Sequence, residues 1–122
     1  MTEYVYGLNK SGLSVIKLLK FQKKTFHCWD DNKKTRDSLK KKFSNLNFTR
    51  INNTNLEKYN NIYLTPGISI YDKKVSKVSK LRIKRDLNLY SQNLKNETVV
   101  AITGTNGKST TTKLIGDIIK RK

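Results

Sequence analysis

The sequence predicts an α/β fold in which helices flank a mostly parallel sheet. Short apolar segments alternate along the chain with segments whose apolar residues recur at helical spacing. Two of the apolar segments lead into glycine loops that open a helix, a connection typical of βα units. With 122 residues and 35% hydrophobic content, the chain has room for one small domain and the beginning of a second.

The first βα unit is expected near the N-terminus. Residues 4–8 form a short apolar strand, and a glycine turn at residues 7–12 follows it. Beyond this turn, the apolar residues stand at helical spacing, at Leu13, Val15, Ile16, Leu18 and Leu19. The turn therefore leads into a helix N-terminus, where free backbone amides favour an anion.

The second unit consists of a strand at 25–29, the pair Asp30 and Asp31, and a polar helix at 33–43. A weak third strand is expected at 48–51 and a fourth at 61–64. The fourth strand ends in Thr65-Pro66-Gly67, whose proline and glycine fit the central positions of a type II turn.

The remainder of the first domain is less regular. Val75 and Val78 indicate a short helix, residues 81–83 a possible strand and residues 86–92 another helix. A polar tract at 91–97 then marks a domain boundary. The predicted organisation is a first domain at 1–92, a linker at 93–97 and the start of a second domain at 98–122.

The last quarter of the chain carries the most specific motif. An apolar run at 98–103, expected to be a strand, leads into a glycine loop and a helix-compatible segment. The phosphate-binding P-loop pattern is G-x-x-x-x-G-K-[ST], and here the first glycine is displaced, so the loop is a shorter variant. The predicted ATP-binding residues are Gly104, Thr105, Asn106, Gly107, Lys108, Ser109 and Thr110. Lys108 would contact the β- and γ-phosphates, and the hydroxyl of Ser109 or Thr110 would bind Mg²⁺.

Three further candidate binding segments follow predicted strands. They are the glycine turn at 7–12, Asp30-Asp31 and residues 65–67. In parallel sheets of this kind, ligands bind beyond the carboxyl ends of the strands, which favours a Rossmann-like nucleotide-binding domain. The G-x-G-x-x-G pattern is incomplete because Asn9 occupies the second glycine position. Asp30 and Asp31 also fit a purely structural role as caps of the following helix.

The composition sets limits on other functions. The net charge of +17, from 26 Lys and Arg against 9 Asp and Glu, is spread along the chain without a recognisable nucleic-acid module, so nucleic acid is not expected as a partner. A basic binding module without catalysis is the alternative from a different functional class.

The single cysteine excludes an internal disulfide and a zinc-ligand set, and no signal peptide or membrane span is indicated, so a cytoplasmic location is expected. His27 and Cys28 lie inside an apolar strand and fit packed side chains better than a base or a nucleophile.

Several segments together resemble the Mur ligases of peptidoglycan synthesis, in the family's order and spacing. They are GLNKSGLS at 7–14, WD at 29–30, LTPGI at 64–68, RDLNLY at 85–90 and VAITGTNGKST at 100–110. The first and third of these segments resemble most closely the members that add D-glutamate. The alternative within the family is a member that adds L-alanine or a diamino acid.

The resemblance implies an enzyme of three domains: a Rossmann-like domain that binds the UDP end of the substrate, a central ATPase domain and a C-terminal domain. It implies that Lys10 and Ser11 meet the uridine diphosphate through backbone amides and that Asp30 contacts the uridine. Thr65 and Gly67 would approach the pyrophosphate. Asp31, Asn32 and Asn88 depart from the family's usual residues, and the family often has a cation after the aspartate that Asp30 matches.

The implied reaction consumes ATP with Mg²⁺ to convert the carboxylate of UDP-N-acetylmuramoyl-L-alanine into an acyl phosphate, which the amine of D-glutamate attacks. Lys108 would be catalytic by neutralising charge on the transferred phosphoryl group, and Ser109 would hold the metal. Only residues 109–122 follow that lysine, whereas the chemistry needs a further acidic metal ligand. The chain is therefore expected to be an N-terminal piece of a longer ligase and to be inactive alone.

Overall fold

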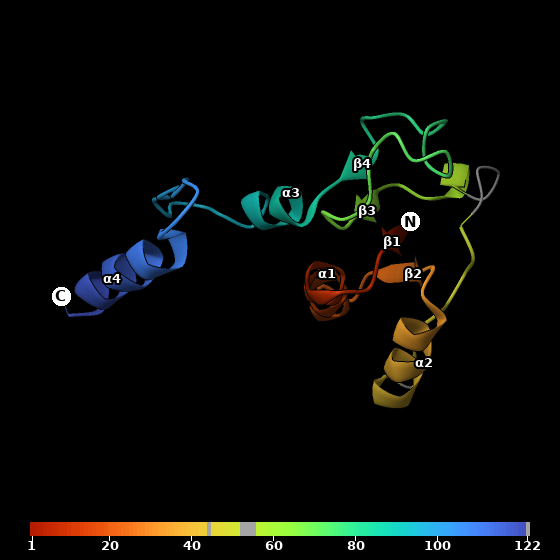
Figure 1. The fold of residues 1–122 in the computed structure, drawn as a ribbon. Helices are drawn as coiled ribbons and strands as arrows, with labels where there is room; N and C mark the ends of the chain where they lie inside the picture. Colours follow the sequence, from red (N-terminus) through yellow and green to blue (C-terminus); the bar gives the residue numbers. More distant parts are fainter. Residues whose placement is uncertain (44, 52–55, 122) are drawn as a thin grey trace.

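The computed structural model describes residues 1–43, 45–51 and 56–121 (Figure 1). Its strands are β1 (Thr2–Tyr6), β2 (Thr25–Trp29), β3 (Ile62–Leu64) and β4 (Ile83–Lys84). Its helices are α1 (Lys10–Phe21), α2 (Lys33–Lys42), α3 (Asp86–Ser91) and α4 (Lys108–Lys120), and a 3₁₀ turn, η1, spans Leu56–Lys58. Residue 122, at the end of the predicted last segment, lies outside the described residues.

The four strands form one sheet in the order β2-β1-β3-β4, and all three pairings are parallel. Tyr4 in the central strand pairs with His27 of β2 on one side and with Ile62 of β3 on the other. The predicted α/β fold is confirmed. Because the chain moves from one side of β1 to the other between β2 and β3, the carboxyl ends of β1 and β3 flank the point where ligands bind in such sheets.

The two faces of the sheet are covered by different kinds of structure. Val5 of β1 and Tyr63 of β3 face a core that includes residues of α1, Leu39 of α2 and Leu89 of α3. Tyr4 and Tyr6 point to the opposite face, as the period of two in a strand requires. That face is closed by the segments around η1 and by the turns that contain Val75.

Two glycines hold the first loop against the end of β3. Gly7 has a φ of +92°, and a Cβ there would lie 2.1 Å from the Thr65 hydroxyl oxygen. A Cβ at Gly12 would lie 1.9 Å from the carbonyl oxygen of Gly7. Contacts this short leave no room for a Cβ at either position, so both residues must be glycine.

The structure corrects several predicted elements. The third strand predicted at 48–51 is reduced to an isolated bridge between Phe48 and Cys28. Hydrogen-bonded turns replace the helix predicted around Val75 and Val78, because these two residues face the core from a looped segment. The strand predicted at 81–83 is shifted to β4, and the helices at 33–43 and 86–92 end slightly earlier than predicted.

The segment that contains the predicted P-loop stands apart from the sheet (Figure 1). Residues 98–103 form no strand, which corrects the prediction, and Val99 and Val100 are exposed. A strand needs a hydrogen-bonding neighbour, and the described residues supply none beside this run. The helix α4 does form, although none of its residues is buried and Leu114, Ile118 and Ile119 are exposed.

We predict that Gly12→Ala lowers the free energy of unfolding by about 2–4 kcal/mol, since the new methyl group overlaps a backbone oxygen that cannot move without the loop. Urea unfolding followed by circular dichroism measures this loss. Gly67→Ala is the matched control, because a Cβ at Gly67 meets nothing within 4 Å. Equal stability of the two variants would contradict the packing described for the loop.

Candidate functional site

A pocket of about 460 Å³ opens at the carboxyl ends of β1, β2 and β3. Its position at the switch point of the sheet is the one expected for a ligand site in a parallel α/β fold. The three segments predicted from the sequence all contribute to it. The lining residues are Tyr6, Gly7, Asn9, Asp30, Asp31, Thr65, Gly67, Ile68, Ser69 and Asp72.

Asp30 organises the backbone at the base of this pocket. One oxygen of its carboxylate accepts from the Leu8 amide at 2.7 Å, and the other accepts from the Asn32 amide at 2.8 Å. Asp30 therefore ties the end of β2 to the glycine loop after β1. The helix-capping role that was the alternative for Asp30 falls to Asn32, whose side chain accepts from the Lys34 amide at 2.9 Å.

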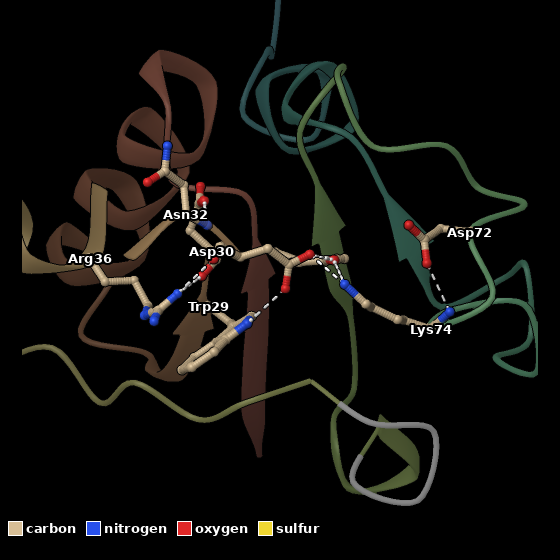
Figure 2. A network of polar contacts seen from close by, with 8 residues as sticks. Trp29, Asp30, Asn32, Arg36, Asp72 and Lys74 are labelled. Carbon is tan, nitrogen blue, oxygen red and sulfur yellow. Dashed lines mark hydrogen bonds and ion pairs between the residues drawn. The ribbon is translucent and has the colours of Figure 1, made fainter. Parts of the chain in front are cut away.

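Asp31 is the centre of a separate polar network at the pocket. Its carboxylate accepts from the Tyr6 hydroxyl at 2.5 Å and from the Trp29 indole at 3.1 Å. The Lys74 ammonium lies 2.5 Å from the same carboxylate and also donates to the Tyr6 hydroxyl at 3.1 Å. In Figure 2 the side chains of Trp29 and Lys74 point toward each other from opposite sides of this network.

This network changes the acidity of its members. Burial by itself raises the pKa of Asp31, but hydrogen bonds from Lys74, Tyr6 and Trp29 outweigh burial and lower the pKa below its usual value. The hydrogen bond to Asp31 raises the pKa of Lys74. Burial and then the hydrogen bond to Asp31 raise the pKa of Tyr6 to about 12. At neutral pH the network holds one carboxylate and one ammonium beside a neutral phenol.

Arg36 supports the same strand end from α2. Its guanidinium donates to the carbonyl oxygens of Asp30 at 2.6 Å and Asp31 at 3.0 Å. It also lies over the Trp29 ring, 4.2 Å from the ring centroid. A second cation thus accompanies the Asp30-Asp31 pair, although it contacts backbone oxygens.

The loop after β3 is fixed to the strands on both sides. The Thr65 amide donates to the Tyr6 carbonyl at 3.1 Å, and the guanidinium of Arg85 donates to the Thr65 carbonyl at 2.6 Å. The Ile68 amide closes the predicted turn on the Thr65 carbonyl at 2.9 Å. The predicted type II geometry is wrong, because Gly67 does not have the positive φ that this turn requires.

Lys10 and Ser11 occupy the first turn of α1, beside the pocket but outside its lining. The structure therefore does not bring their side chains into the pocket with Asp30 and Gly67, although Ser11 lines a small neighbouring cavity with Thr65. Asn9, the N-cap residue, lines the pocket without a capping hydrogen bond from its side chain. The first amides of α1 are consequently available at the pocket edge, an arrangement that suits a phosphate.

The predicted P-loop residues lie elsewhere, at the start of α4. Gly104 and Gly107 have φ of +146° and +75°, and Gly107 caps the helix without a side-chain hydrogen bond. The Lys108 ammonium donates to the Gly104 carbonyl and, at 3.4 Å, to the Thr105 carbonyl. Glycine-dependent backbone, open helix amides and a lysine folded over the loop fit a polyphosphate. Ser109 and Thr110 are exposed in the first turn of this helix.

Other residues singled out in the sequence have packing roles. Cys28 is fully buried, and burial raises the pKa of its thiol to about 12, which removes it as a nucleophile at neutral pH. His27 shares a hydrogen bond with the Tyr59 hydroxyl at 2.6 Å. Asn88 accepts from the Arg85 amide at 2.8 Å at the start of α3, so its side chain caps this helix.

Sequence reasoning missed part of the pocket. Asp72 and Lys74 belong to a looped segment, and no motif connects them to Asp31, which lies 43 residues away from Lys74. Asp31 belongs to the Asp30-Asp31 segment predicted as a candidate at the end of the second strand, but no residue of the loop after β3 was predicted to contact it. Its position after β2 was the one available signal that it faces the site.

Within the described residues, no helix is both long and apolar enough to cross a membrane. Likewise, the part of the chain that the structure describes contains no group of three or more His, Cys, Asp or Glu side chains arranged to hold a metal ion.

Residues 1–85 match the family described as Mur ligase MurD-like, N-terminal domain. Curated relatives are named UDP-N-acetylmuramoylalanine-D-glutamate ligase. The relative from Wolbachia sp. subsp. Brugia malayi is 37% identical over 123 residues, covering 95% of this chain and 25% of the relative. The Rickettsia prowazekii relative is 35% identical over 117 residues, covering 94% of this chain and 26% of the relative. The chain thus spans about a quarter of the length of the curated relatives it matches.

We predict that Asp31 stabilises the fold in a pH-dependent way. Because its pKa is lower in the folded chain, its contribution is present above the usual aspartate pKa of about 3.9 and is lost as the pH falls through the folded value. The stability difference between wild type and Asp31→Asn should therefore shrink between pH 6 and pH 3. The difference should stay below about 1 kcal/mol, since the pair with Lys74 is half-exposed.

Urea unfolding at pH 6, 4.5 and 3 measures this difference. Asp37→Asn, at an exposed position in α2, is the control for loss of a carboxylate. A difference for Asp31→Asn that did not change with pH would contradict the linkage.

Proposed function

This chain belongs to the MurD-like Mur ligases, and we propose that it supplies the UDP-binding domain of an ATP-dependent ligase that adds D-glutamate to UDP-N-acetylmuramoyl-L-alanine. The observation that carries the proposal is the convergence of three strand-end loops on one pocket at the switch point of the sheet. The names of the relatives supply the substrate and the reaction class.

In this proposal the pocket binds the nucleotide mainly through backbone groups. The first amides of α1, at Lys10 and Ser11, face the diphosphate together with the loop that contains Thr65 and Gly67. Asp30 contacts the uridine end and also keeps the glycine loop in position through the Leu8 amide. The exclusion of side chains at Gly7 supports this role, because a diphosphate must approach the backbone closely.

The second part of the proposal concerns ATP and Mg²⁺. The loop from Gly104 to Thr110 would hold the phosphates with its amides, Lys108 would offset charge on the transferred phosphoryl group, and Ser109 would be a metal ligand. When bound, ATP supplies the phosphoryl group that activates the substrate carboxylate. The exposed glycine loop and a helix N-terminus whose amides have no side-chain cap support this assignment.

The proposed organisation follows the sequence prediction. Residues 1–92 form the UDP-substrate domain, 93–97 the linker and 98–122 the beginning of the ATP-binding domain. The match of residues 1–85 to an N-terminal family domain supports this division. The proposed location is the cytoplasm, where the nucleotide substrates are found.

We predict that the chain binds UDP-N-acetylmuramoyl-L-alanine saturably and that Asp30→Ala weakens this binding at least tenfold, since the variant frees the Leu8 amide and loosens the loop. Isothermal titration calorimetry measures both affinities. Asp37→Ala, at an exposed site on α2, is the matched control. If Asp30→Ala bound the substrate as tightly as wild type, Asp30 would not belong to the site. If the chain bound random DNA tightly and did not bind the substrate, a basic binding module would be favoured.

The catalytic assignment of Lys108 requires the rest of a ligase. We propose a chimera in which residues 1–122 replace the aligned segment of the Wolbachia relative. Ligation of D-glutamate by this chimera should fall at least 100-fold on Lys108→Ala, because the lysine stabilises developing charge. Lys113→Ala, one turn further along α4, is the control. Full activity of the Lys108→Ala chimera would refute the role.

A further inference from the structure

The pocket has an unexpected charge for a site that receives a diphosphate. Its lining includes the carboxylates of Asp30, Asp31 and Asp72, and no lysine or arginine is among the described lining residues. The chain as a whole carries a net charge of +17, so the acidic lining is a local feature. Unbalanced carboxylates a few ångströms from a diphosphate would oppose its binding.

The three carboxylates are not balanced in the same way. Both oxygens of Asp30 accept backbone amides, and Asp72 accepts the Lys74 amide at 2.8 Å. Within the described residues, Asp31 forms an ion pair, and its partner is the Lys74 ammonium at 2.5 Å. Lys74 therefore brings a full positive charge to the acidic pocket.

The position of Lys74 is fixed by its surroundings. Its backbone amide is held by Asp72, and the next residue, Val75, is fully buried against the sheet. Its ammonium also donates to the Tyr6 hydroxyl, which in turn donates to Asp31. The side chain thus spans from the loop after β3 to the end of β2.

We propose that Lys74 is a specificity-determining residue, whose ammonium offsets the charge of Asp31 so that the acidic pocket accepts an anionic nucleoside diphosphate. This inference rests on the proposed function of the pocket. As a structural link between the loop and β2, the Lys74–Asp31 pair would add little to stability, because both side chains are half-exposed. The charge of Lys74, in contrast, would change the binding free energy of a ligand in proportion to the charge that the ligand carries.

The experiment measures UDP and uridine binding by isothermal titration calorimetry at low ionic strength. Lys74→Met should weaken UDP binding about tenfold, the order expected for one unit charge near a partly solvated ligand. Uridine, which has no charge, should bind Lys74→Met within twofold of wild type. Lys74→Met combined with Asp31→Asn should recover most of the UDP affinity, because the pair is removed without changing the net charge.

Lys77→Met is the matched control, since it removes the same charge three residues further along the same exposed segment. Thermal unfolding of each variant confirms that it is folded. The role of Lys74 would be overturned if Lys74→Met lost uridine affinity and UDP affinity to the same extent. It would also be overturned if the double variant bound UDP as weakly as Lys74→Met alone. Absence of UDP binding by wild type would overturn the proposed function together with this inference.

Discussion

The close approach of the backbone at Gly7 to Gly12 and Thr65 is the constraint on which the pocket depends. Parallel pairing of β1 with β2 and β3 brings three chain reversals to one edge of the sheet. A side chain at Gly7 would overlap Thr65, and one at Gly12 would overlap the Gly7 carbonyl, so either would displace the first loop and the start of α1. With only hydrogen atoms there, the start of α1 lies directly beside the loop that follows Leu64.

Consecutive aspartates at the end of β2 have different tasks. Asp30 faces the backbone and secures the shape of the first loop, whereas Asp31 faces the loop after β3 and gathers three side-chain donors. Arg36 of α2 donates to the backbone carbonyl oxygens of both residues. A short strand end is thereby linked to β1, α2 and the loop after β3, so the geometry of the pocket does not depend on β2 alone.

The elements with regular periodicity could be predicted from the sequence, and those defined by tertiary contacts could not. The strands β1 and β2 and the helix α1 have clear apolar patterns between glycine or acidic turns, so these three elements could be predicted from the pattern alone. Val75 and Val78 have helical spacing, yet they pack from turns against the face of the sheet that carries Tyr4 and Tyr6. The pocket was predicted where residues directly follow strands, as for Asp30 and Gly67. Lys74 was missed because its partner is distant in sequence.

The only tryptophan of the chain, Trp29, stands at this edge of the sheet. Its indole nitrogen donates to Asp31 while its ring is covered by the Arg36 guanidinium. The emission of an indole depends on its hydrogen bonding and on nearby charges. The protein therefore contains a built-in optical reporter whose signal originates next to the pocket, and the occupancy of that pocket can be followed without attaching a label.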